Sequence, residues 1–409
     1  MDESEHNPGP LEGVLVLDLS RVLAGPWATQ ALADLGAEVI KVERPGAGDD
    51  TRQWGPPFAT TAGGGQGDAA YFFAANRGKR SVTVDIARPE GAALVRALAE
   101  RADVLVENFK VGGLRKYGLD HASLAAPNPR LVYCSITGFG QTGPDAGRAG
   151  YDYMIQAMGG LMSITGEEGR PPVKVGVAVA DLFAGLYASN AILAALLHAR
   201  ATGEGQHIDI ALFEAQAAML ANQATNWFVS GEVPRRLGGA HPNLAPYQPL
   251  PTADGDLVVA VGNDGQFQAL CRALGAPELG QDPCFNTNAL RVGHRAELTA
   301  ALEALTTART THAWIGILEA AGVPCGPINT VEEVFAEPQA QARGLVVEQA
   351  RGDLDAPIRS VASPMRLSAT PVSYRAPPPA LGQDTEAVLE EQLGLSTDRI
   401  AELKAQGVI

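Results

Sequence analysis

The feature that most constrains the fold is a strand, a helix and a second strand at short spacing near the start of the chain. The apolar run Val14–Asp18 is typical of a buried strand. We expect a turn over residues 20–26, a helix over 27–35 and a second strand over 38–43. Two strands joined by one helix form a right-handed parallel unit. This start therefore predicts a parallel sheet.

The pattern recurs further along the chain. Helical periodicity over residues 91–101 precedes an apolar strand at 104–106, and another strand is expected at 131–136. A long helix is expected at 181–200 with Thr202-Gly203 at its end, followed by a strand at 206–213. The fold class is therefore α/β, with a large Rossmann-like domain built on a mostly parallel sheet.

The middle and the end of the chain have a different character. A Gly- and Pro-rich connector over 231–251 leads to a strand at 257–261, and residues 247–330 indicate a smaller α+β domain. The run 376–379 (APPP) predicts a stiff extended linker before an amphipathic helix at 384–393.

Composition excludes several classes of function. The 409 residues include 31 Lys plus Arg and 46 Asp plus Glu, a net charge of −15, which disfavours nucleic acid as a partner. No apolar run reaches the roughly 18 residues of a membrane span, and residues 182–197 are interpreted as a buried helix. The start of the chain lacks the pattern of a signal peptide. The scattered Cys and His residues indicate neither a disulfide framework nor a metal site. We expect a soluble cytoplasmic protein that binds neither membrane nor nucleic acid.

Basic residues are concentrated between residues 41 and 116. This segment holds 12 basic and 9 acidic residues, a local charge of +3. Many lie near expected strand ends, where open parallel sheets bind ligands. The segment favours an anionic, phosphate-bearing ligand, although a solvated surface is the alternative for each residue. The residues are Lys41, Arg44, Arg77, Lys79, Arg80, Lys110, Arg115 and Lys116.

The first turn permits a test for dinucleotide binding. Glu43 ends the second strand, as an acid does in dinucleotide-binding proteins. The turn at 20–26 (SRVLAGP) has only one glycine, however, and Pro26 removes an amide that a pyrophosphate would use. A dinucleotide-dependent oxidoreductase is therefore the more distant alternative.

Asp181 is the acid with the most chemical interest. It follows a mostly apolar run and opens the long helix, so it is a candidate N-cap, a structural role. The functional alternative uses the same place: the helix dipole would keep the carboxylate ionised at neutral pH, ready to attack an activated acyl group. The residues alone leave both interpretations open.

Many ordered segments resemble one known family, the family III CoA-transferases typified by formyl-CoA transferase and carnitine CoA-transferase. The resemblance begins at residue 11 and covers nearly the whole chain. It rests on 11–20 (LEGVLVLDLS), 24–26 (AGP), 35–45 (LGAEVIKVERP), 78–81 (GKRS), 106–109 (VENF), 150–152 (GYD), 160–166 (GLMSITG), Asp181, 202–205 (TGEG), 322–327 (GVPCGP) and 381–385 (LGQDT).

The resemblance implies an architecture. Residues 11–230 would form the N-terminal part of the large domain, residues 231–335 the connector and small domain, and residues 336–409 a return segment that completes the large domain. Two chains would interlock as a homodimer.

The resemblance also implies a mechanism with Asp181 as nucleophile. Its carboxylate would attack an acyl-CoA, and CoA would pass through aspartyl anhydride and aspartyl-CoA thioester intermediates to a carboxylic acid. No metal and no cofactor beyond CoA, itself substrate and product, would be needed.

CoA-binding positions carry over from the family residue by residue. Lys116 stands where formyl-CoA transferase has an arginine, Asp152 where it usually has a glutamate, and Arg148 lies one place from a family lysine. The implied CoA-binding residues are Val22, Leu23, Ala24, Arg44, Val84, Asn108, Phe109, Lys110, Lys116, Arg148, Tyr151 and Asp152.

Departures from the family pattern bear on the substrate. Leu23 replaces a glutamine of formyl-CoA transferase, and the glycine-only loop of that enzyme has no counterpart. The pattern is closer to the branch that uses succinyl-CoA and dicarboxylic acids such as glutarate. Arg236 and His241 are candidates to bind the remote carboxylate of the acceptor, with a surface position as the alternative.

Two other classes share these features. Acyl-CoA racemases of the same superfamily place a histidine about where Tyr151 stands, and a tyrosine, with a reference pKa of about 10, is a poor proton carrier near neutral pH. A 2-methylacyl-CoA racemase is therefore the nearer alternative. In a non-catalytic binding module, Asp181 would be only a helix cap.

Overall fold

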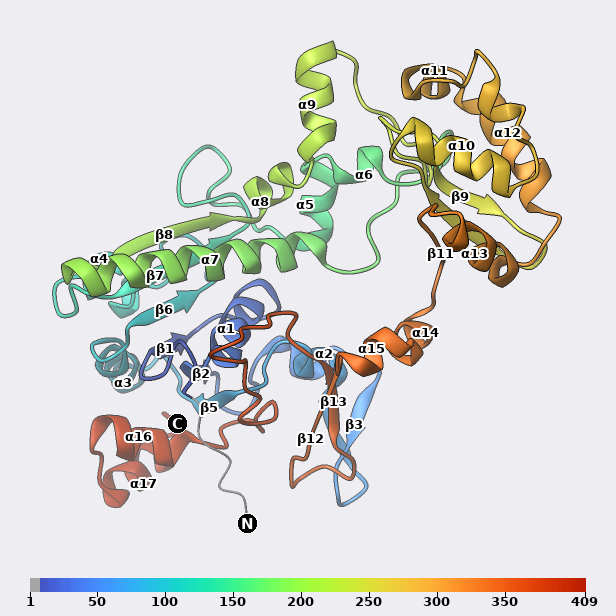
Figure 1. The fold of residues 1–409 in the computed structure, drawn as a ribbon. Helices are drawn as coiled ribbons and strands as arrows, with labels where there is room; N and C mark the ends of the chain where they lie inside the picture. Colours follow the sequence, from blue (N-terminus) through green and yellow to red (C-terminus); the bar gives the residue numbers. More distant parts are fainter. Residues whose placement is uncertain (1–7) are drawn as a thin grey trace. The chain divides into compact units, whose positions relative to one another are not determined.

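The structure is a computed structural model that describes residues 8–409 (Figure 1). The chain divides into two compact units. Unit 1 contains the chain up to Gly159 with Gly176–Met219 and Gln341–Ile409, and unit 2 contains Gly160–Val175 and Leu220–Ala340. The expected first segment, residues 11–230, is thus shared between the units.

Hydrogen bonds explain why residues 160–175 group with unit 2. The Gly238 N–H donates to the Gly166 carbonyl at 3.0 Å, and the Arg236 side chain donates to the carbonyls of Glu167 and Arg170. These contacts join segments about seventy residues apart in sequence, which no local pattern could indicate.

A six-stranded parallel sheet organises unit 1. Its order is β5-β2-β1-β6-β7-β8, and every neighbouring pair is parallel. The chain moves outward from β1 in one direction and then crosses to the other side, so the order reverses between β1 and β6. The strands are β1 (Leu15–Asp18), β2 (Glu38–Glu43), β5 (Lys79–Thr83), β6 (Val104–Glu107), β7 (Val132–Thr137) and β8 (Gln206–Ala211). The predicted α/β class with a mostly parallel sheet is confirmed.

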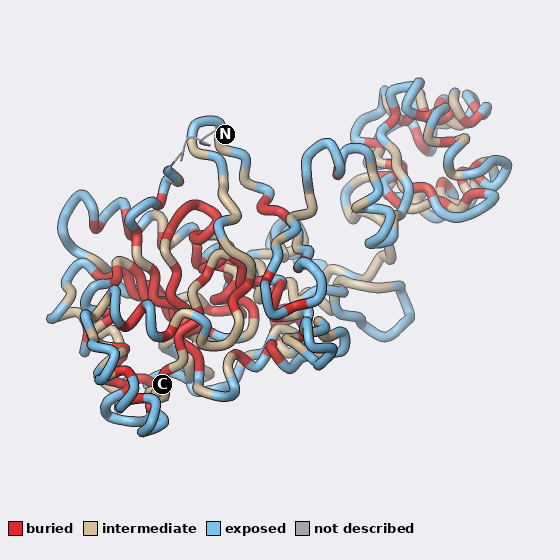
Figure 2. Tube along the Cα trace, turned by 90° about the horizontal axis from the view of Figure 1, so that it is seen from below, coloured by how far each residue is buried: buried red, intermediate tan, exposed pale blue. Residues whose placement is uncertain are grey.

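Each face of the sheet packs on its own hydrophobic core. Val16 and Val106 contribute to a core with α1 (Ala24–Asp34) and α7 (Val179–Thr202), whereas Leu17 and Leu105 contribute to a core with α3 (Pro89–Ala99) and α16 (Thr385–Leu393). Neighbours along a strand face opposite sides, so an all-apolar strand supplies both cores. Figure 2 shows the buried chain concentrated in this region.

Helix α7 is the one helix within residues 8–409 that is long and apolar enough to cross a membrane. Ala184, Ala188 and Ile192 lie in the core of unit 1, packed with strand residues such as Val132 and Ile208. The core helix of a globular unit passes the same test of length and composition, and this packing identifies α7 as a partly buried core helix.

The start of α1 and the number of C-terminal helices differ from those expected. Helix α1 begins at Ala24 and not at residue 27, because proline is tolerated in a first helical turn and Pro26 does not delay the helix. The C-terminal segment forms two helices, α16 and α17 (Thr397–Ala405), the second of which was not predicted. The Ser396 hydroxyl caps α17 by accepting from the Arg399 N–H.

The proline-rich run at 376–379 packs within unit 1. Arg351 donates to the Pro378 carbonyl and Arg52 to the Pro379 carbonyl, each at 3.2 Å. Two neighbouring carbonyls of this run are therefore hydrogen-bonded to arginines from two different segments of unit 1. The remaining elements of unit 1 include β3 (Phe58–Thr60), β4 (Gln66–Ala69), α2 (Ala70–Phe73), α4 (His121–Leu124), α5 (Asp152–Met158), α8 (Leu212–Ala218), β12 (Val346–Gln349) and β13 (Ile358–Val361).

Unit 2 is built on a three-stranded antiparallel sheet of order β11-β10-β9. Its core includes Leu257, Phe267 and Trp314, and the fully buried Arg291 donates to the carbonyls of Ala245 and Phe285. The elements are α6 (Leu161–Ile164), α9 (Ala221–Ser230), β9 (Tyr247–Pro251), β10 (Asp256–Ala260), α10 (Asp264–Ala273), α11 (Asn288–Gly293), α12 (Arg295–Thr306), α13 (Thr311–Ala320), β11 (Cys325–Pro327) and α14 (Val331–Ala336); α15 (Pro338–Ala342) leads back to unit 1.

Candidate active site

The predicted CoA-binding residues of the first half of the chain follow the carboxyl ends of four neighbouring strands. Val22 follows β1, Arg44 follows β2, Val84 follows β5 and Asn108 follows β6. These ends share one edge of the sheet, which includes the point where the strand order reverses. Open α/β sheets bind their ligands at that point.

Side-chain hydrogen bonds join the loop after β6 to the turn after β1. The Asn108 side chain accepts from the Arg21 N–H at 2.9 Å and donates to the Arg21 carbonyl at 2.7 Å. The Arg21 guanidinium lies 5.8 Å from the centre of the Phe109 ring. The structure therefore brings the two predicted CoA-contacting runs together, and it adds Arg21, which sequence reasoning missed.

At the start of α1, the turn after β1 presents backbone N–H groups that have no hydrogen-bond partner within residues 8–409. Leu23 is the N-cap of α1, and no side chain caps this helix. The first N–H groups of a helix have no partner inside it, so they form a site for a negatively charged or developing oxyanion group. The side chains of Leu23, Ala24 and Val84 are buried, so the backbone is what these residues present.

Several basic residues expected to favour an anionic ligand are instead buried in ion pairs. Lys41 pairs with Asp49 at 2.9 Å, Lys79 with Asp18 at 3.0 Å and Arg77 with Asp34 at 2.7 Å. Burial lowers the pKa of Lys79 to about 8, although Asp18 acts in the opposite direction. For these three residues the expectation of a ligand-binding role is wrong, because buried charges require partners.

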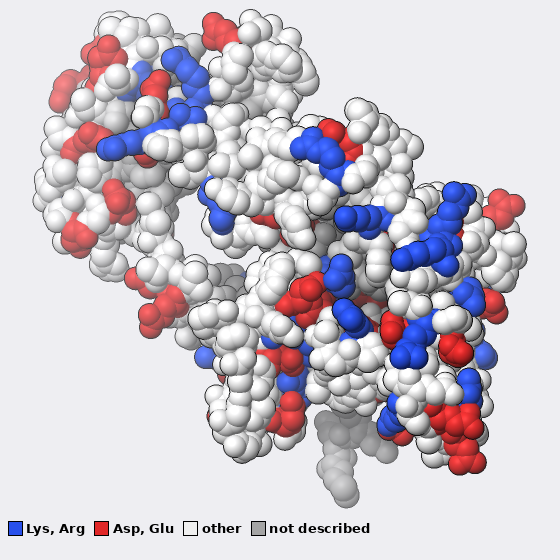
Figure 3. Space-filling view, turned by 180° about the vertical axis from the view of Figure 1, so that it is seen from behind, with Lys and Arg blue, Asp and Glu red and all other residues white. Residues whose placement is uncertain are grey.

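The other five of the eight basic residues named for this segment lie at the surface or partly so. Arg80 bridges Glu38 and Glu391, whereas Arg44, Lys110, Arg115 and Lys116 are exposed. On the face seen in Figure 3, Lys and Arg are interspersed with Asp and Glu and do not form one basic surface. Any phosphate contact therefore rests on a few exposed cations.

Asp181 is the third residue of α7 and not its N-cap, which is Ala178. The helix begins at Val179, two residues earlier than expected. The capping role belongs to Asp152, which accepts from the Ala180 N–H at 2.8 Å. The structural interpretation of Asp181 as a cap is thus wrong, and its carboxyl group is free for another role.

A glycine brings Asp181 toward the turn after β1. A Cβ atom on Gly185 would lie 2.7 Å from the Ala24 carbonyl oxygen, so only glycine permits α7 to approach α1 this closely. Asp181 precedes Gly185 by four residues and therefore projects from the same face of α7. The candidate nucleophile consequently lies on the helix face that meets the beginning of α1.

The protonation of Asp181 differs from the expectation. Burial raises its pKa from 3.8 to about 7, and the Asp152 carboxylate adds to the rise. The carboxyl group is therefore about half protonated at neutral pH, because burial disfavours its charged form. Strongly shifted acids of this kind are characteristic of functional sites.

Tyr151 and Asp152 are positioned by a close backbone contact. A Cβ atom on Gly150 would lie 2.3 Å from the Gly138 Cα, so two glycines allow the segment before α5 to cross the end of β7. Tyr151 is the N-cap of α5 and 67% exposed. Asp152 also accepts from the Gln156 side chain at 2.7 Å, which fixes its orientation.

Two aromatic residues of the candidate site were not predicted. Burial raises the pKa of Tyr71, and the charges of Asp181 and Asp152 raise it further, so the Tyr71 hydroxyl lies within their electrostatic reach. Trp54 packs against Tyr71 edge to face at 5.4 Å. A Gly- and Pro-rich stretch without periodicity separates Trp54 from Tyr71 in the short helix α2, so no local pattern could indicate their contact.

The remaining predicted residues are placed as follows. Lys116 lies in the 3-10 turn Arg115–Tyr117, with its ammonium 4.6 Å from the Tyr117 ring centre. Arg148 pairs with Asp145 at 3.1 Å. Arg236 and His241 belong to unit 2, where the His241 Nδ1 accepts from the Asn243 N–H. Within residues 8–409, no group of three or more His, Cys, Asp or Glu side chains is arranged around a metal position.

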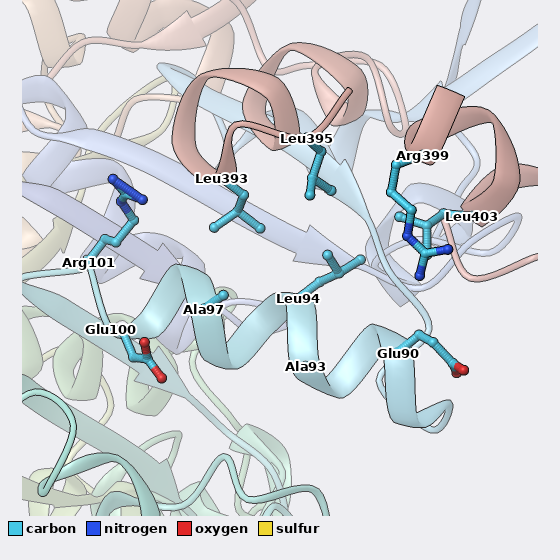
Figure 4. A pocket seen from close by; sticks show the side chains of 10 residues that line it. All are labelled: Glu90, Ala93, Leu94, Ala97, Glu100, Arg101, Leu393, Leu395, Arg399 and Leu403. Atoms are coloured by element: carbon cyan, nitrogen blue, oxygen red, sulfur yellow. The ribbon is translucent and has the colours of Figure 1, made fainter. Parts of the chain in front are cut away.

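A surface pocket of about 450 Å³ lies between α3 and the C-terminal helices α16 and α17 (Figure 4). Leu94 from α3 and Leu395 from the C-terminal segment lie on opposite sides of it, with Arg101 and Arg399 toward its ends. None of the predicted site residues lines it, so it is separate from the candidate site.

Comparison with known proteins decides the family. The model of CoA-transferase family III matches residues 11–385.

The chain belongs to CoA-transferase family III.

Characterised relatives and a solved structure agree with this assignment. The family III chain is 54% identical to the succinate–glutarate CoA-transferase of Agrobacterium fabrum, over 96% of this chain and 98% of the relative. It is 46% identical to the human succinyl-CoA:glutarate CoA-transferase, over 99% of this chain and 91% of the relative. A CAIB/BAIF family protein from Brucella suis has the same fold, with a TM-score of 0.84 and 52% identity over 94% and 100% of the two chains.

Proposed function

We propose that this family III enzyme transfers CoA from succinyl-CoA to a dicarboxylic acid such as glutarate, with Asp181 as the nucleophile. The names of the most similar relatives support the substrate pair. The observation that carries the mechanism is a carboxyl group with a pKa of about 7, on the helix face that meets the uncapped start of α1.

The reaction proceeds through four acyl transfers. The Asp181 carboxylate attacks the succinyl thioester, giving a succinyl–aspartyl anhydride and CoA thiolate. The thiolate attacks the aspartyl carbonyl, releasing succinate and leaving an aspartyl-CoA thioester. Glutarate attacks this thioester to form a second anhydride and thiolate, and the thiolate then takes the glutaryl group and regenerates Asp181.

The surroundings of Asp181 suit these steps. Only the ionised carboxylate is a nucleophile, and a pKa near 7 keeps a large fraction ionised while increasing its basicity. The tetrahedral intermediates carry a negative oxygen, which backbone N–H groups at a helix N-terminus stabilise. The first turn of α1 supplies such donors at Leu23 and Ala24.

The proposed CoA site follows the sheet edge. The turn at Val22–Ala24 and the loop at Asn108–Lys110 receive the CoA chain, joined by the Asn108 bonds to Arg21. Arg44 and Lys116, both exposed, contact phosphates, and Val84 contributes backbone near the adenine. Arg148, Tyr151 and Asp152 line the acyl side, whereas Arg236 and His241 are proposed for the acceptor carboxylate.

A homodimer is proposed because large apolar side chains are exposed on helices α7 and α9. On α7, Leu197 is 70% exposed, and on α9, Phe228 and Val229 are 72% and 83% exposed. Exposed apolar patches of this kind mark protein interfaces. We propose a cytoplasmic homodimer, and sedimentation equilibrium would measure its mass.

Trapping the aspartyl-CoA thioester tests the proposed function. The protein is incubated with succinyl-CoA without acceptor, digested with trypsin and measured by mass spectrometry. Asp181 is the only acid in the peptide Val175–Arg200, so a CoA adduct there identifies the nucleophile directly. Addition of glutarate should discharge the adduct and yield glutaryl-CoA. An active enzyme whose adduct lies on another peptide would contradict the assignment.

A further inference from the structure

Val22 has a backbone conformation that its side chain disfavours. Its φ is +72°, in the left-handed region, and only one other non-glycine residue within residues 8–409, Ala221, has a positive φ. A β-branched residue is strained there. Such strain persists only where the surrounding structure enforces it, and it is often associated with function.

One buried ion pair holds the backbone that leads into this residue, from the Ser20 carbonyl to the Val22 N–H. The Lys41 ammonium donates to the Ser20 carbonyl at 2.9 Å, and the Val22 N–H donates to both Asp49 carboxylate oxygens at 3.2 and 3.3 Å. Lys41 and Asp49 pair at 2.9 Å, and both side chains are fully buried. The pair therefore acts as one clamp on the turn.

The clamp is itself rigidly held. The Asp49 carboxylate also accepts from the Thr51 N–H and hydroxyl, and the Asp49 N–H donates to Glu43. Burial alone would raise the pKa of Asp49, but the Lys41 charge lowers it to about 2, so this carboxylate is ionised at neutral pH. Arg52 in turn binds Glu43 at 2.7 Å.

We propose that Lys41 and Asp49 are positioning residues, which force Val22 into the left-handed conformation and so aim the first turn of α1 at the acyl-CoA. The inference rests on the proposed function, in which that turn contacts the substrate, and neither charge needs to touch CoA itself. The alternative is a buried ion pair that serves stability alone.

The test removes the clamp without burying a lone charge. The double variant Lys41→Met with Asp49→Ala replaces both charged groups together, because loss of one partner would be far more disruptive. The KM for acyl-CoA should rise about tenfold, the factor expected when the strained turn relaxes, and the KM for the acceptor acid should change less.

A glycine provides the decisive readout. Glycine adopts positive φ readily. Adding Val22→Gly to the clamp variant should therefore lower the KM for acyl-CoA most of the way back to the wild-type value. The matched control removes another buried pair, Asp34→Ala with Arg77→Met, whose salt bridge of 2.7 Å holds no part of this turn. The control should lower the melting temperature and leave the acyl-CoA KM within about twofold of wild type.

Failure of this inference is distinguishable from failure of the proposed function. In one outcome, the wild-type protein transfers CoA but Val22→Gly fails to lower the KM of the clamp variant. In another, the wild-type protein transfers CoA but the control variant raises the KM for acyl-CoA equally. Either result leaves the proposed function standing and overturns the clamp. A crystal structure of the clamp variant in which Val22 keeps its positive φ also overturns it, whatever the protein catalyses.

Discussion

Replacing Asp181 with asparagine should inactivate the enzyme and stabilise its fold at the same time. Burial and Asp152 raise the pKa of Asp181 from 3.8 to about 7. The folded state thus holds this proton more tightly than the unfolded chain does. Stability is therefore lost as pH rises from about 4 to about 7, and the full penalty is present above pH 7. An asparagine side chain is neutral at every pH, so the Asp181→Asn variant escapes the penalty.

The magnitude follows from the size of the pKa difference. A difference of about 3 pH units at about 1.4 kcal/mol each gives an upper bound of about 4 kcal/mol at pH 8. At pH 5 the loss of stability corresponds to about 1.2 pH units, or about 1.7 kcal/mol. The cost of burying the amide lowers both values equally, so the difference of about 2 kcal/mol between the two pH values is the sharper prediction.

Urea denaturation of wild type and variant at pH 5 and pH 8 measures this difference. The exposed Asp355→Asn is the control for loss of a surface carboxylate and should show little pH-dependent change. CoA transfer by Asp181→Asn is measured in parallel and should be absent. If the stability difference between Asp181→Asn and wild type stays constant between pH 5 and pH 8, the explanation by burial of an ionisable group is refuted.

Four further outcomes are expected. Asp152→Asn removes the like charge beside Asp181, so the acid limb of the pH profile of kcat/KM should move about one unit lower; a shift upward would contradict this cause. Gly185→Ala places a Cβ 2.7 Å from the Ala24 oxygen and should lower both melting temperature and activity, whereas Gly316→Ala, with open space around its Cβ in α13, should do neither. Arg44→Ala should raise the KM for acyl-CoA more than that for the acid, in a salt-dependent way, and equal effects would argue against a phosphate contact. With Tyr151 in place of a histidine, the enzyme should not exchange the α-hydrogen of a 2-methylacyl-CoA in deuterated water; rapid exchange without CoA transfer would favour the racemase.

The candidate site was only partly predictable from sequence. The order of motifs identified the family and pointed to Asp181, and the family model confirms the membership. The partners of Asp181 could not be predicted, because Asp152 reaches the start of α7 across 28 residues of sequence. Trp54 and Tyr71 were missed for the same reason, since their proximity to one another is a result of folding.

The sequence by itself determined the parallel sheet and the position of most of its strands, although β5 (Lys79–Thr83) was not predicted. Periodicity and apolar runs are local properties, and they located β1, β2, β6 and β7 within about two residues. Only the tertiary structure decided the state of the charges. Lys79 and Asp18 are 61 residues apart and Arg77 and Asp34 are 43 apart, yet each pair is buried together. The protonation of Asp181 and the strained conformation of Val22 likewise depend on burial and on distant partners, because electrostatic energies and enforced backbone angles arise from contacts that exist only in the folded chain.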